Sequence, residues 1–372
     1  MPRYFFVAVA LCASLTVSGE PARVVQNVIV YKEAERFAGW PANNGMWTWG
    51  DDEIVLGFTL GWHKEKEGHT IDPEKKSVRR FARSLDGGLT WSLDPEGNFQ
   101  DPGQADAKPL TKAMDFTHPD FALLFVMTSS KTGFSRFFYS TDRCKTWNGP
   151  YVFPELGQIG IMARTDYVVD GRRKLMTFMT AGKKDDTEGV PFCARTTDGG
   201  LTWKFVSYIT PEPPKGGYSI MPATVRVGKD ELVSIIRRRE RLFTDKSAWW
   251  IDCWKSYDNG KSWELKHNPL AANEGNPATL TVLEDGRIVC VYGHRGAPYG
   301  IRAKISLDNG DHWGDEIILR NDGALWDLGY PRTVLRPDGN LVTAYYFNDP
   351  AQKERYIAAT IWNPGTGDGL AP

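Results

Sequence analysis

Short apolar runs recur along the whole chain, and turn-forming residues separate them. Runs such as VRRFARS (78–84), DELVSII (230–236) and GNLVTAYYF (339–347) are rich in β-branched and aromatic residues and are bounded by Gly, Asp or Ser. This pattern is typical of β-strands joined by tight turns. The chain is therefore predicted to be an all-β protein.

An eight-residue turn motif follows such a run five times. The copies are SLDGGLTW (84–91), STDRCKTW (140–147), TTDGGLTW (196–203), SYDNGKSW (256–263) and SLDNGDHW (306–313). In this motif Asp and Ser/Thr accept backbone N–H bonds, Gly adopts angles that other residues avoid, and Trp packs beneath. Cys144 replaces Gly in the second copy. We therefore interpret the motif aspartates as structural, namely Asp86, Asp142, Asp198, Asp258 and Asp308.

A second feature recurs six times and predicts the innermost strands. Proline opens an apolar run at Pro41, Pro119, Pro222, Pro277 and Pro331, and MARTDYVV at Arg164 fills the same position without proline. Six such units predict a six-bladed β-propeller with Asp-containing turns between strands. The sixth unit lacks an outer strand. VVQNVIVY (24–31) is predicted to supply it and to close the ring.

The N-terminus predicts export. One Arg, an apolar run over residues 4–17 and small residues near position 22 have the layout of a signal peptide, which we place at residues 1–22. The alternative is a membrane anchor, but the run is short and no second apolar stretch follows, so we expect no stable membrane insertion. Residues 23–372 then form one propeller domain, secreted or periplasmic.

Charge and cysteine usage narrow the classes of partner. The 45 Lys and Arg residues are matched by 46 Asp and Glu, so a general nucleic-acid-binding surface is not predicted. The cysteines show no CxxC spacing, so a zinc site is not indicated. No other metal is implied by ligand spacing, and no cofactor is expected. Cys193, Cys253 and Cys290 lie in strand-like runs and are interpreted as small buried residues.

The five turn motifs on six strand units behind a signal peptide resemble the Asp-box, or BNR, repeats of the sialidase (neuraminidase) superfamily. The resemblance covers nearly all of the predicted mature chain and implies the propeller fold. It also implies a site at the centre of the ring, where family members use a Tyr nucleophile assisted by Glu, an Asp acid/base and three arginines that hold the sugar carboxylate.

The resemblance places the nucleophile at Tyr330, in the GYP sequence that opens the last inner strand. The second arginine falls in SIIRRRER (234–241), where alternation prevents Arg237, Arg238 and Arg239 from all facing one way. We take Arg238 for this role and Arg295 in CVYGHRG for the third. The substrate-binding candidates are Arg238, Arg295, Trp40 and, in reserve, Arg302 and Arg332.

Two family positions are changed in this chain. Gly39 and Trp40 stand where the first arginine is expected, and Met221 and Pro222 stand where the Glu is expected. Tyr330 then needs another base, for which Asp327 and Asp120 are candidates.

The acid/base is expected in the loop GWHKEKEGHTIDPEKKS (61–77). Asp72 is the best positional match there, and the alternatives are Glu65, Glu67, His63 and His69. His118, which opens the second predicted inner strand beside Asp120, is a further acid/base candidate. The catalytic candidates are therefore Tyr330, Asp72, His118 and Asp120.

The resemblance implies a secreted exo-glycoside hydrolase that acts on a terminal acidic sugar of a glycan or polysaccharide. The two changed positions leave two alternatives open. One is a carbohydrate-binding propeller without catalysis, and the other is an exo-acting hydrolase or lyase on a different sugar.

Overall fold

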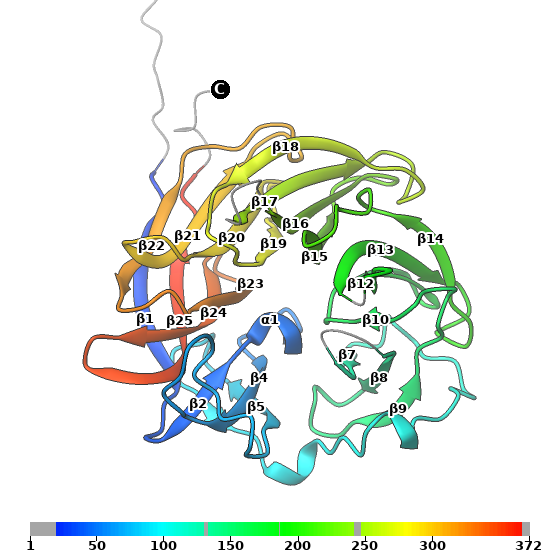
Figure 1. Cartoon of the computed structure of the whole chain (residues 1–372), viewed down its shortest axis with the longest axis horizontal. Coiled ribbons are helices and arrows are strands. Elements are labelled where there is room, and N and C mark those ends of the chain that lie inside the picture. Colours follow the sequence, from blue (N-terminus) through cyan, green and yellow to red (C-terminus); the bar gives the residue numbers. More distant parts are fainter. Residues whose placement is uncertain (1–19, 130–132, 186, 242–246, 367–372) are drawn as a thin grey trace, which may run out of the picture.

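Six antiparallel sheets surround a central axis in the computed structural model of the protein (Figure 1). The structure describes residues 20–129, 133–185, 187–241 and 247–366. The prediction of an all-β six-bladed propeller is confirmed. The predicted signal peptide, residues 1–22, lies outside the described residues over positions 1–19.

The first three blades, in chain order, run from β2 to β14. Blade 1 contains β2 (Arg36–Gly39), α1 (Pro41–Asn44), β3 (Met46–Thr48), β4 (Ile54–Trp62), β5 (Val78–Ser84) and β6 (Ser92–Leu93). Two short 3-10 helices follow, η1 (Glu96–Asn98) and η2 (Gln104–Asp106). Blade 2 contains β7 (Ala122–Met127), β8 (Ser135–Ser140) and β9 (Asn148–Val152). Blade 3 contains β10 (Ile161–Met162), β11 (Tyr167–Gly171), β12 (Lys174–Gly182), β13 (Glu188–Thr196) and β14 (Lys204–Tyr208).

The last three blades have four strands each. Blade 4 contains β15 (Tyr218–Arg226), β16 (Leu232–Arg241), β17 (Ser247–Ser256) and β18 (Glu264–Ala271). Blade 5 contains β19 (Ala278–Val282), β20 (Ile288–His294), β21 (Tyr299–Ser306) and β22 (Ile317–Gly323). Blade 6 contains β23 (Gly329–Leu335), β24 (Leu341–Asp349), β25 (Gln352–Asn363) and β1 (Arg23–Tyr31).

The ring is closed by the N-terminal strand, as predicted. β1 pairs antiparallel with β25, in a register that sets Val24 opposite Trp362 and Val28 opposite Ala359. This pairing satisfies the outer edge of the last C-terminal strand. It also ties the two ends of the described chain together, so that the ring of sheets cannot open without breaking a strand pair.

The five repeated turns have the hydrogen bonds that their residue types predict. In the first copy the Asp86 carboxylate accepts bonds from the Thr90 amide (2.9 Å) and hydroxyl (2.5 Å), while the Ser84 hydroxyl oxygen accepts one from the Gly88 amide (2.8 Å). Cys144 keeps the same conformation at φ 65°, where the other copies have Gly. The aspartates are thus engaged within their own turns.

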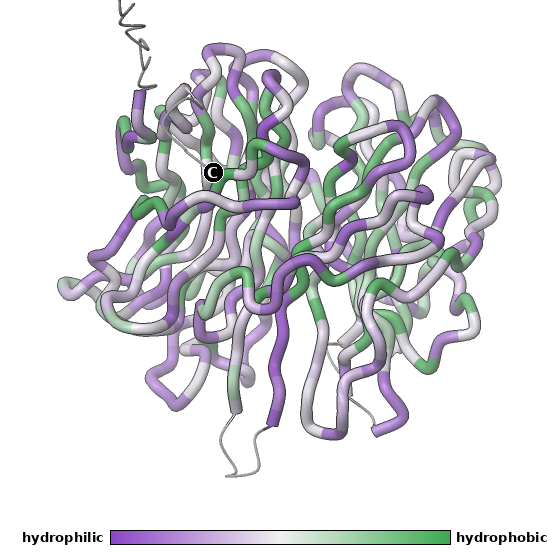
Figure 2. The backbone as a smooth tube through the Cα atoms, turned by 90° about the horizontal axis from the view of Figure 1, so that it is seen from above, coloured by the Kyte–Doolittle hydropathy of each residue, from purple (hydrophilic) through white to green (hydrophobic). Residues whose placement is uncertain are grey.

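The core lies between neighbouring blades, and the hydrophobic segments in Figure 2 run along the strands, with many hydrophilic turns around them. The four described cysteines, Cys144, Cys193, Cys253 and Cys290, are free and buried. Within the described part of the chain, no helix is long and apolar enough to cross a membrane.

The prediction of an inner strand at 118–125 is wrong. In the other four blades with a turn motif, the first or second residue of the second strand pairs with the first residue of the motif, as Leu232 does with Ser256. β7 has this relationship, because Ala122 pairs with Ser140. β7 is therefore a second strand, and sheet β7-β8-β9 has no strand inside it among the described residues.

Candidate functional site

Strand direction brings the chemically interesting side chains to one face of the ring. Each repeated turn follows a third strand, so third strands end and second strands begin on the turn face. Second strands end, and inner and third strands begin, on the opposite face. The ends of β16 and β20 and the starts of β13 and β23 therefore all lie on the face opposite the repeated turns.

Tyr330 lies at the start of β23 on this face, where a bulge interrupts the strand. Its backbone has φ 50°, an uncommon conformation for a residue with a bulky side chain, and its amide donates to the Asn276 side chain at 2.9 Å. The hydroxyl oxygen of the buried Tyr330 accepts a hydrogen bond from Arg237 Nη1 at 2.9 Å. Such strain persists where the surrounding structure enforces it, and it is common at functional sites.

Positive charge surrounds the Tyr330 hydroxyl. Burial raises the pKa of this phenol, but the guanidinium groups of Arg237, Arg295 and Arg164 outweigh that effect and hold the pKa below its ordinary value of 10.0. The tyrosinate form is thereby stabilised by neighbouring charge. This site favours an anion at the position of the phenol oxygen.

The structure brings Arg237 to Tyr330 in place of the predicted Arg238. Arg238 points into blade 4, where it donates to Ser219 at 2.6 Å and lies 3.5 Å from the Asp252 carboxylate. Arg237 and Arg239 share the other side of β16 and lie over the Tyr218 ring, at 5.4 and 4.7 Å from its centre. The pKa of Asp252 is raised to about 7 by burial.

Arg295, the candidate for the third arginine, follows β20 and lies against Tyr330, although protein groups already engage its nitrogens. Its guanidinium carbon is 5.5 Å from the Tyr330 ring centre and 5.1 Å from that of Trp326. It donates to the Leu328 carbonyl at 3.1 Å and to the Tyr346 hydroxyl at 2.8 Å. Arg295 thus supplies positive charge from a fixed position.

Arg164 is the third cation beside Tyr330, and its carboxylate partner is Glu188 from the start of β13. The guanidinium binds both Glu188 oxygens, with Nη2 at 3.2 Å from Oε2, and also the Asn43 side chain at 3.0 Å. The negative charge of Glu188 also stabilises the protonated form of Arg237. Both Arg164 and Glu188 are shielded from solvent, so the pair is a fixed ion pair at the rim of the site.

His69 and Asp327 form a hydrogen-bonded pair that Tyr346 connects to Tyr330, since the rings of the two tyrosines lie 5.9 Å apart. His69 Nδ1 lies 2.6 Å from the Asp327 carboxylate, which also accepts a 2.6 Å bond from the Tyr346 hydroxyl. Burial raises the pKa of Asp327, but the contacts with His69, Tyr346 and Arg295 dominate and lower it. His69 is 36% exposed, and no described group hydrogen-bonds its Nε2 atom. This nitrogen is available to a ligand.

Aromatic residues frame this pair, and Trp40 is one of them. The Trp40 ring lies 5.4 Å from the His69 ring, and the Trp326 ring lies 5.7 Å away on another side. Trp40, Met221 and Tyr330 all have positive φ values (59°, 55° and 50°), and each precedes a proline. The three residues pack in one apolar cluster. The same backbone conformation before a proline therefore recurs in blades 1, 4 and 6, and the three side chains together form the base of the site.

Asp72 stays within its own loop. Its carboxylate accepts a bond from the Glu74 amide at 3.1 Å and lies 3.5 Å from the Lys64 ammonium. No described contact joins Asp72 to Tyr330 or to the arginines. From the same loop it is His69, one of the alternatives, that reaches the site. His63 instead lies 3.4 Å from Glu65.

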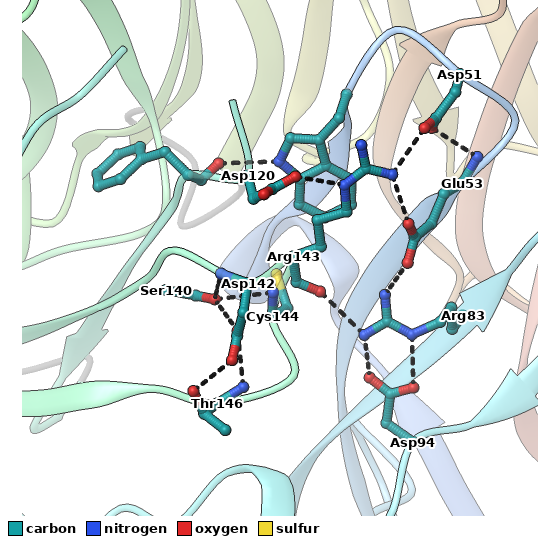
Figure 3. Close-up of polar contacts among 12 residues, drawn as sticks. Asp51, Glu53, Arg83, Asp94, Asp120, Ser140, Asp142, Arg143, Cys144 and Thr146 are labelled. Atoms are coloured by element: carbon teal, nitrogen blue, oxygen red, sulfur yellow. Dashed lines mark hydrogen bonds and ion pairs between the residues drawn. The ribbon is translucent and has the colours of Figure 1, made fainter. Parts of the chain in front are cut away.

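His118 and Asp120 lie on the turn face, so their predicted place at the site is wrong. The Asp120 carboxylate binds Arg143 at 2.7 Å, and Arg143 also binds Asp51 and Glu53, as Figure 3 shows. The Asp120 amide donates to His118 Nδ1 at 3.2 Å. The reason is that β7 is a second strand, which begins on the turn face. Asp120 therefore cannot serve Tyr330 as a base.

The remaining two candidate arginines, Arg302 and Arg332, donate hydrogen bonds to backbone carbonyls. Arg302 is buried in blade 5, where it donates to the carbonyls of Arg320 and Pro298 and lies 3.2 Å from Glu316. Arg332 donates to the carbonyls of Ala42 (2.7 Å) and Thr165. It therefore ties blade 6 to α1 and blade 3, and neither arginine contacts Tyr330.

Sequence reasoning missed Glu188, Tyr346 and Trp326 as parts of the site. Of these three residues, only Glu188 could have been found from the sequence, because it begins a strand on the face where the loop 61–77 was predicted to lie. Among the described residues, no group of three His, Cys, Asp or Glu side chains is placed to hold a metal ion.

Fold and site together define a BNR-type propeller with a cationic, tyrosine-centred site. The chain belongs to the BNR repeat-like domain family, whose profile matches residues 101–343. A search of curated protein sequences found no match.

Several solved structures share the fold. A protein of unknown function from Dyadobacter fermentans is similar over 92% of this chain and 99% of its own, at 23% identity and a TM-score of 0.73. The NanB sialidase of Streptococcus pneumoniae matches 92% of this chain and 71% of its own, at 11% identity and a TM-score of 0.61. An α-L-arabinofuranosidase of Fusarium graminearum matches 91% of this chain and 97% of its own, at 14% identity and a TM-score of 0.58. At these identities the likeness establishes the fold alone.

Proposed function

We propose that the protein is a secreted, sialidase-like exo-glycoside hydrolase that acts on a terminal acidic sugar of a glycan or polysaccharide. The observation that supports this most is the Tyr330 hydroxyl, which is buried, hydrogen-bonded by Arg237 at 2.9 Å and surrounded by three guanidinium groups. Such a site attracts an anionic sugar and activates the phenol.

The arginines compensate for the missing family glutamate. No described carboxylate contacts the Tyr330 hydroxyl, and Met221 occupies the position of that Glu. A tyrosine with a lowered pKa ionises more readily and needs less help from a base. In this proposal Tyr330 Oη attacks the anomeric carbon, and a covalent glycosyl-tyrosine intermediate is then hydrolysed by water, with retained stereochemistry.

We assign the acid/base role to His69 in place of Asp72. Asp327 orients the ring through Nδ1, so Nε2 is the nitrogen that meets the leaving-group oxygen. As acid it protonates that oxygen, and as base it then takes a proton from the attacking water.

The test is a hydrolysis screen of residues 23–372 against aryl glycosides of acidic sugars and their neutral analogues, with the first-formed anomer identified by NMR. We expect cleavage of an acidic glycoside with retention. Tyr330→Phe should abolish it, while Tyr208→Phe, on an outer strand where the tyrosine is 48% exposed, should not. A Tyr330→Phe variant as active as the wild type would refute the nucleophile.

A lyase is the second candidate, because a tyrosine of lowered pKa beside arginines also suits proton abstraction next to a sugar carboxylate. The same screen separates the two reactions, since elimination creates an unsaturated product that absorbs ultraviolet light and consumes no water. Binding without either product would favour the carbohydrate-binding alternative.

A further inference from the structure

A cavity opens between blades 1 and 2, on the face that carries the Tyr330 site. It has a volume of about 680 Å³ and is lined on one side by Thr59 and Arg79 and on another by Phe99 and Asp101. Blade 2 has no described strand inside β7, so this flank of the ring is not filled by a sheet. The long connection after β6 forms the outer wall. The cavity, which we call the blade 1–2 groove, thus follows from the irregular build of blade 2.

Arg79 is the distinctive residue of the groove. Its Nε donates to the Asn44 side chain at 2.5 Å, and its guanidinium carbon lies 5.4 Å from the Phe99 ring centre. Among the described residues, no acceptor binds its two terminal nitrogens. Burial lowers the pKa of Arg79 to about 10, against a weaker opposing effect of Asp101, so the cation persists at neutral pH without a close counter-charge. A partly enclosed guanidinium with two free terminal nitrogens is suited to an anion that presents two oxygen atoms, such as a carboxylate or a sulfate.

The other charges of the groove are mostly paired. Arg80 binds Glu96 at 2.5 Å, and Arg136 binds both oxygens of Asp101. Lys76 lines the groove, is exposed and has no ion-pair partner among the described residues. Arg79 and Lys76 therefore leave the groove with an excess of positive charge, although the whole chain has a net charge of -1.

The groove and the Tyr330 site lie on the same face and are joined by hydrogen bonds. Across blade 1, Gly39 pairs with Thr59 and Thr59 pairs with Arg79. Asn44 accepts from Arg79 and donates to the backbone carbonyl of Trp40 at 2.9 Å. Arg79 is thus connected to Trp40, at the edge of the Tyr330 site, through the buried side chain of Asn44.

We propose that the blade 1–2 groove is a subsite that binds an anionic group, a carboxylate or a sulfate ester, on a sugar unit next to the one held at Tyr330. The neighbouring position rests on the proposed function, whereas the binding of an acidic glycan at Arg79 does not. Arg79 grips the anion through its terminal nitrogens, and Lys76 adds attraction at the mouth. The protein then prefers acidic polymers over isolated acidic sugars.

Calorimetric titration with three tetrasaccharides tests the proposal: a uronic acid oligomer, a sulfated oligomer with neutral backbone, and a neutral oligomer. We expect the wild type to bind one or both acidic probes better than the neutral one, and the probe that binds identifies the anion. Arg79→Gln should weaken that binding about tenfold or more, and Lys76→Gln two- to threefold. The matched control is Arg172→Gln, which removes a 74% exposed arginine on the turn face and should change nothing.

Equal affinity of wild type and both groove variants for the acidic probes, or no preference over the neutral probe, would overturn the subsite. If Arg79→Gln does not fold, as judged by circular dichroism, Lys76→Gln alone decides, since that exposed side chain has no structural partner. Binding that depends on Arg79 in a protein that cleaves nothing would support the groove and refute the hydrolase. Cleavage of acidic aryl glycosides, with the KM for acidic tetrasaccharides unchanged in both variants, would support the hydrolase and refute the groove.

Discussion

Arg237 Nη1 donates a 2.9 Å hydrogen bond to the hydroxyl oxygen of Tyr330, across 93 positions of the sequence and from blade 4 to blade 6. The contact decides the chemical character of the site. Burial alone would raise the pKa of the phenol, but the positive charge of the arginines outweighs burial and lowers it. Tyr346, buried 5.9 Å away between ring centres, has no such contact with Arg237, and burial raises its pKa well above the ordinary value.

Replacing Arg237 by Gln should therefore raise the pKa of Tyr330. In an ultraviolet titration of the wild type, Tyr330 should ionise below pH 10, because the neighbouring guanidinium groups outweigh the effect of burial and lower its pKa. In Arg237→Gln this step should move to higher pH, and glycoside cleavage at neutral pH should fall about 100-fold.

Tyr330→Phe is the control for the assignment, because it should lack the early step altogether. An early tyrosine step that survives in Tyr330→Phe would show that another tyrosine is the acidic one.

Asp327→Asn should destabilise the fold by about 3 kcal/mol at pH 7, because it leaves His69, Tyr346 and Arg355 around a neutral group. The folded-state pKa of Asp327 is lowered, so its contribution is present above its unfolded pKa and is lost as the pH falls through the folded value. Urea unfolding at pH 7 and at successively lower pH should show the gap between variant and wild type closing in acid.

Asp285→Asn is the comparison, since that aspartate is 53% exposed and pairs with Arg287 on the surface. It should change stability by less than about 0.5 kcal/mol at any of these pH values. An Asp327→Asn protein as stable as this control would contradict the buried network.

Trp203→Ala should cost about 3 to 5 kcal/mol of stability, because the ring is buried. Its centre lies 5.1 Å from the ring centre of Phe153 and 6.1 Å from that of Phe125. Trp263→Ala removes a half-buried ring of the equivalent turn and should cost less. Thermal unfolding of both variants measures the difference. Equal melting temperatures would show that burial of the motif tryptophan does not set its contribution.

The repeated turns were predictable because they depend on local sequence, and the ring closure was predictable because the sixth unit lacks an outer strand that only the segment 24–31 was left to supply. Ser84, Asp86 and Gly88 bond to one another within five residues, so their spacing alone predicts the turn. The irregular blade was not predictable in this way. Pro119 resembles the prolines that open inner strands, and only the pairing of Ala122 with Ser140 reveals that β7 is a second strand.

The site was predicted in part. The structure brings the candidates Tyr330 and Arg295 into contact. Alternation alone did not choose between Arg237 and Arg238, because Ile235 and Ile236 before them are both buried. The contact of His69 with Asp327 spans 258 positions. Such a pairing depends on how the loop 61–77 folds over the ring, and residue spacing does not encode it.

His69→Gln is the sharpest test of the proposed chemistry, because it keeps a polar side chain but removes the group that would protonate the leaving oxygen. Cleavage of a glycoside with a poor alkyl leaving group should fall by about 10² to 10⁴. Cleavage of an aryl glycoside with an acidic phenol as leaving group should fall far less, since that oxygen departs without a proton. Asp72→Asn, in the same loop, should leave both rates nearly unchanged, because its carboxylate is held by Glu74 and Lys64. Equal losses on both substrates in His69→Gln would assign the histidine a structural role, and a selective loss in Asp72→Asn would return the acid/base to the position that the family resemblance predicts.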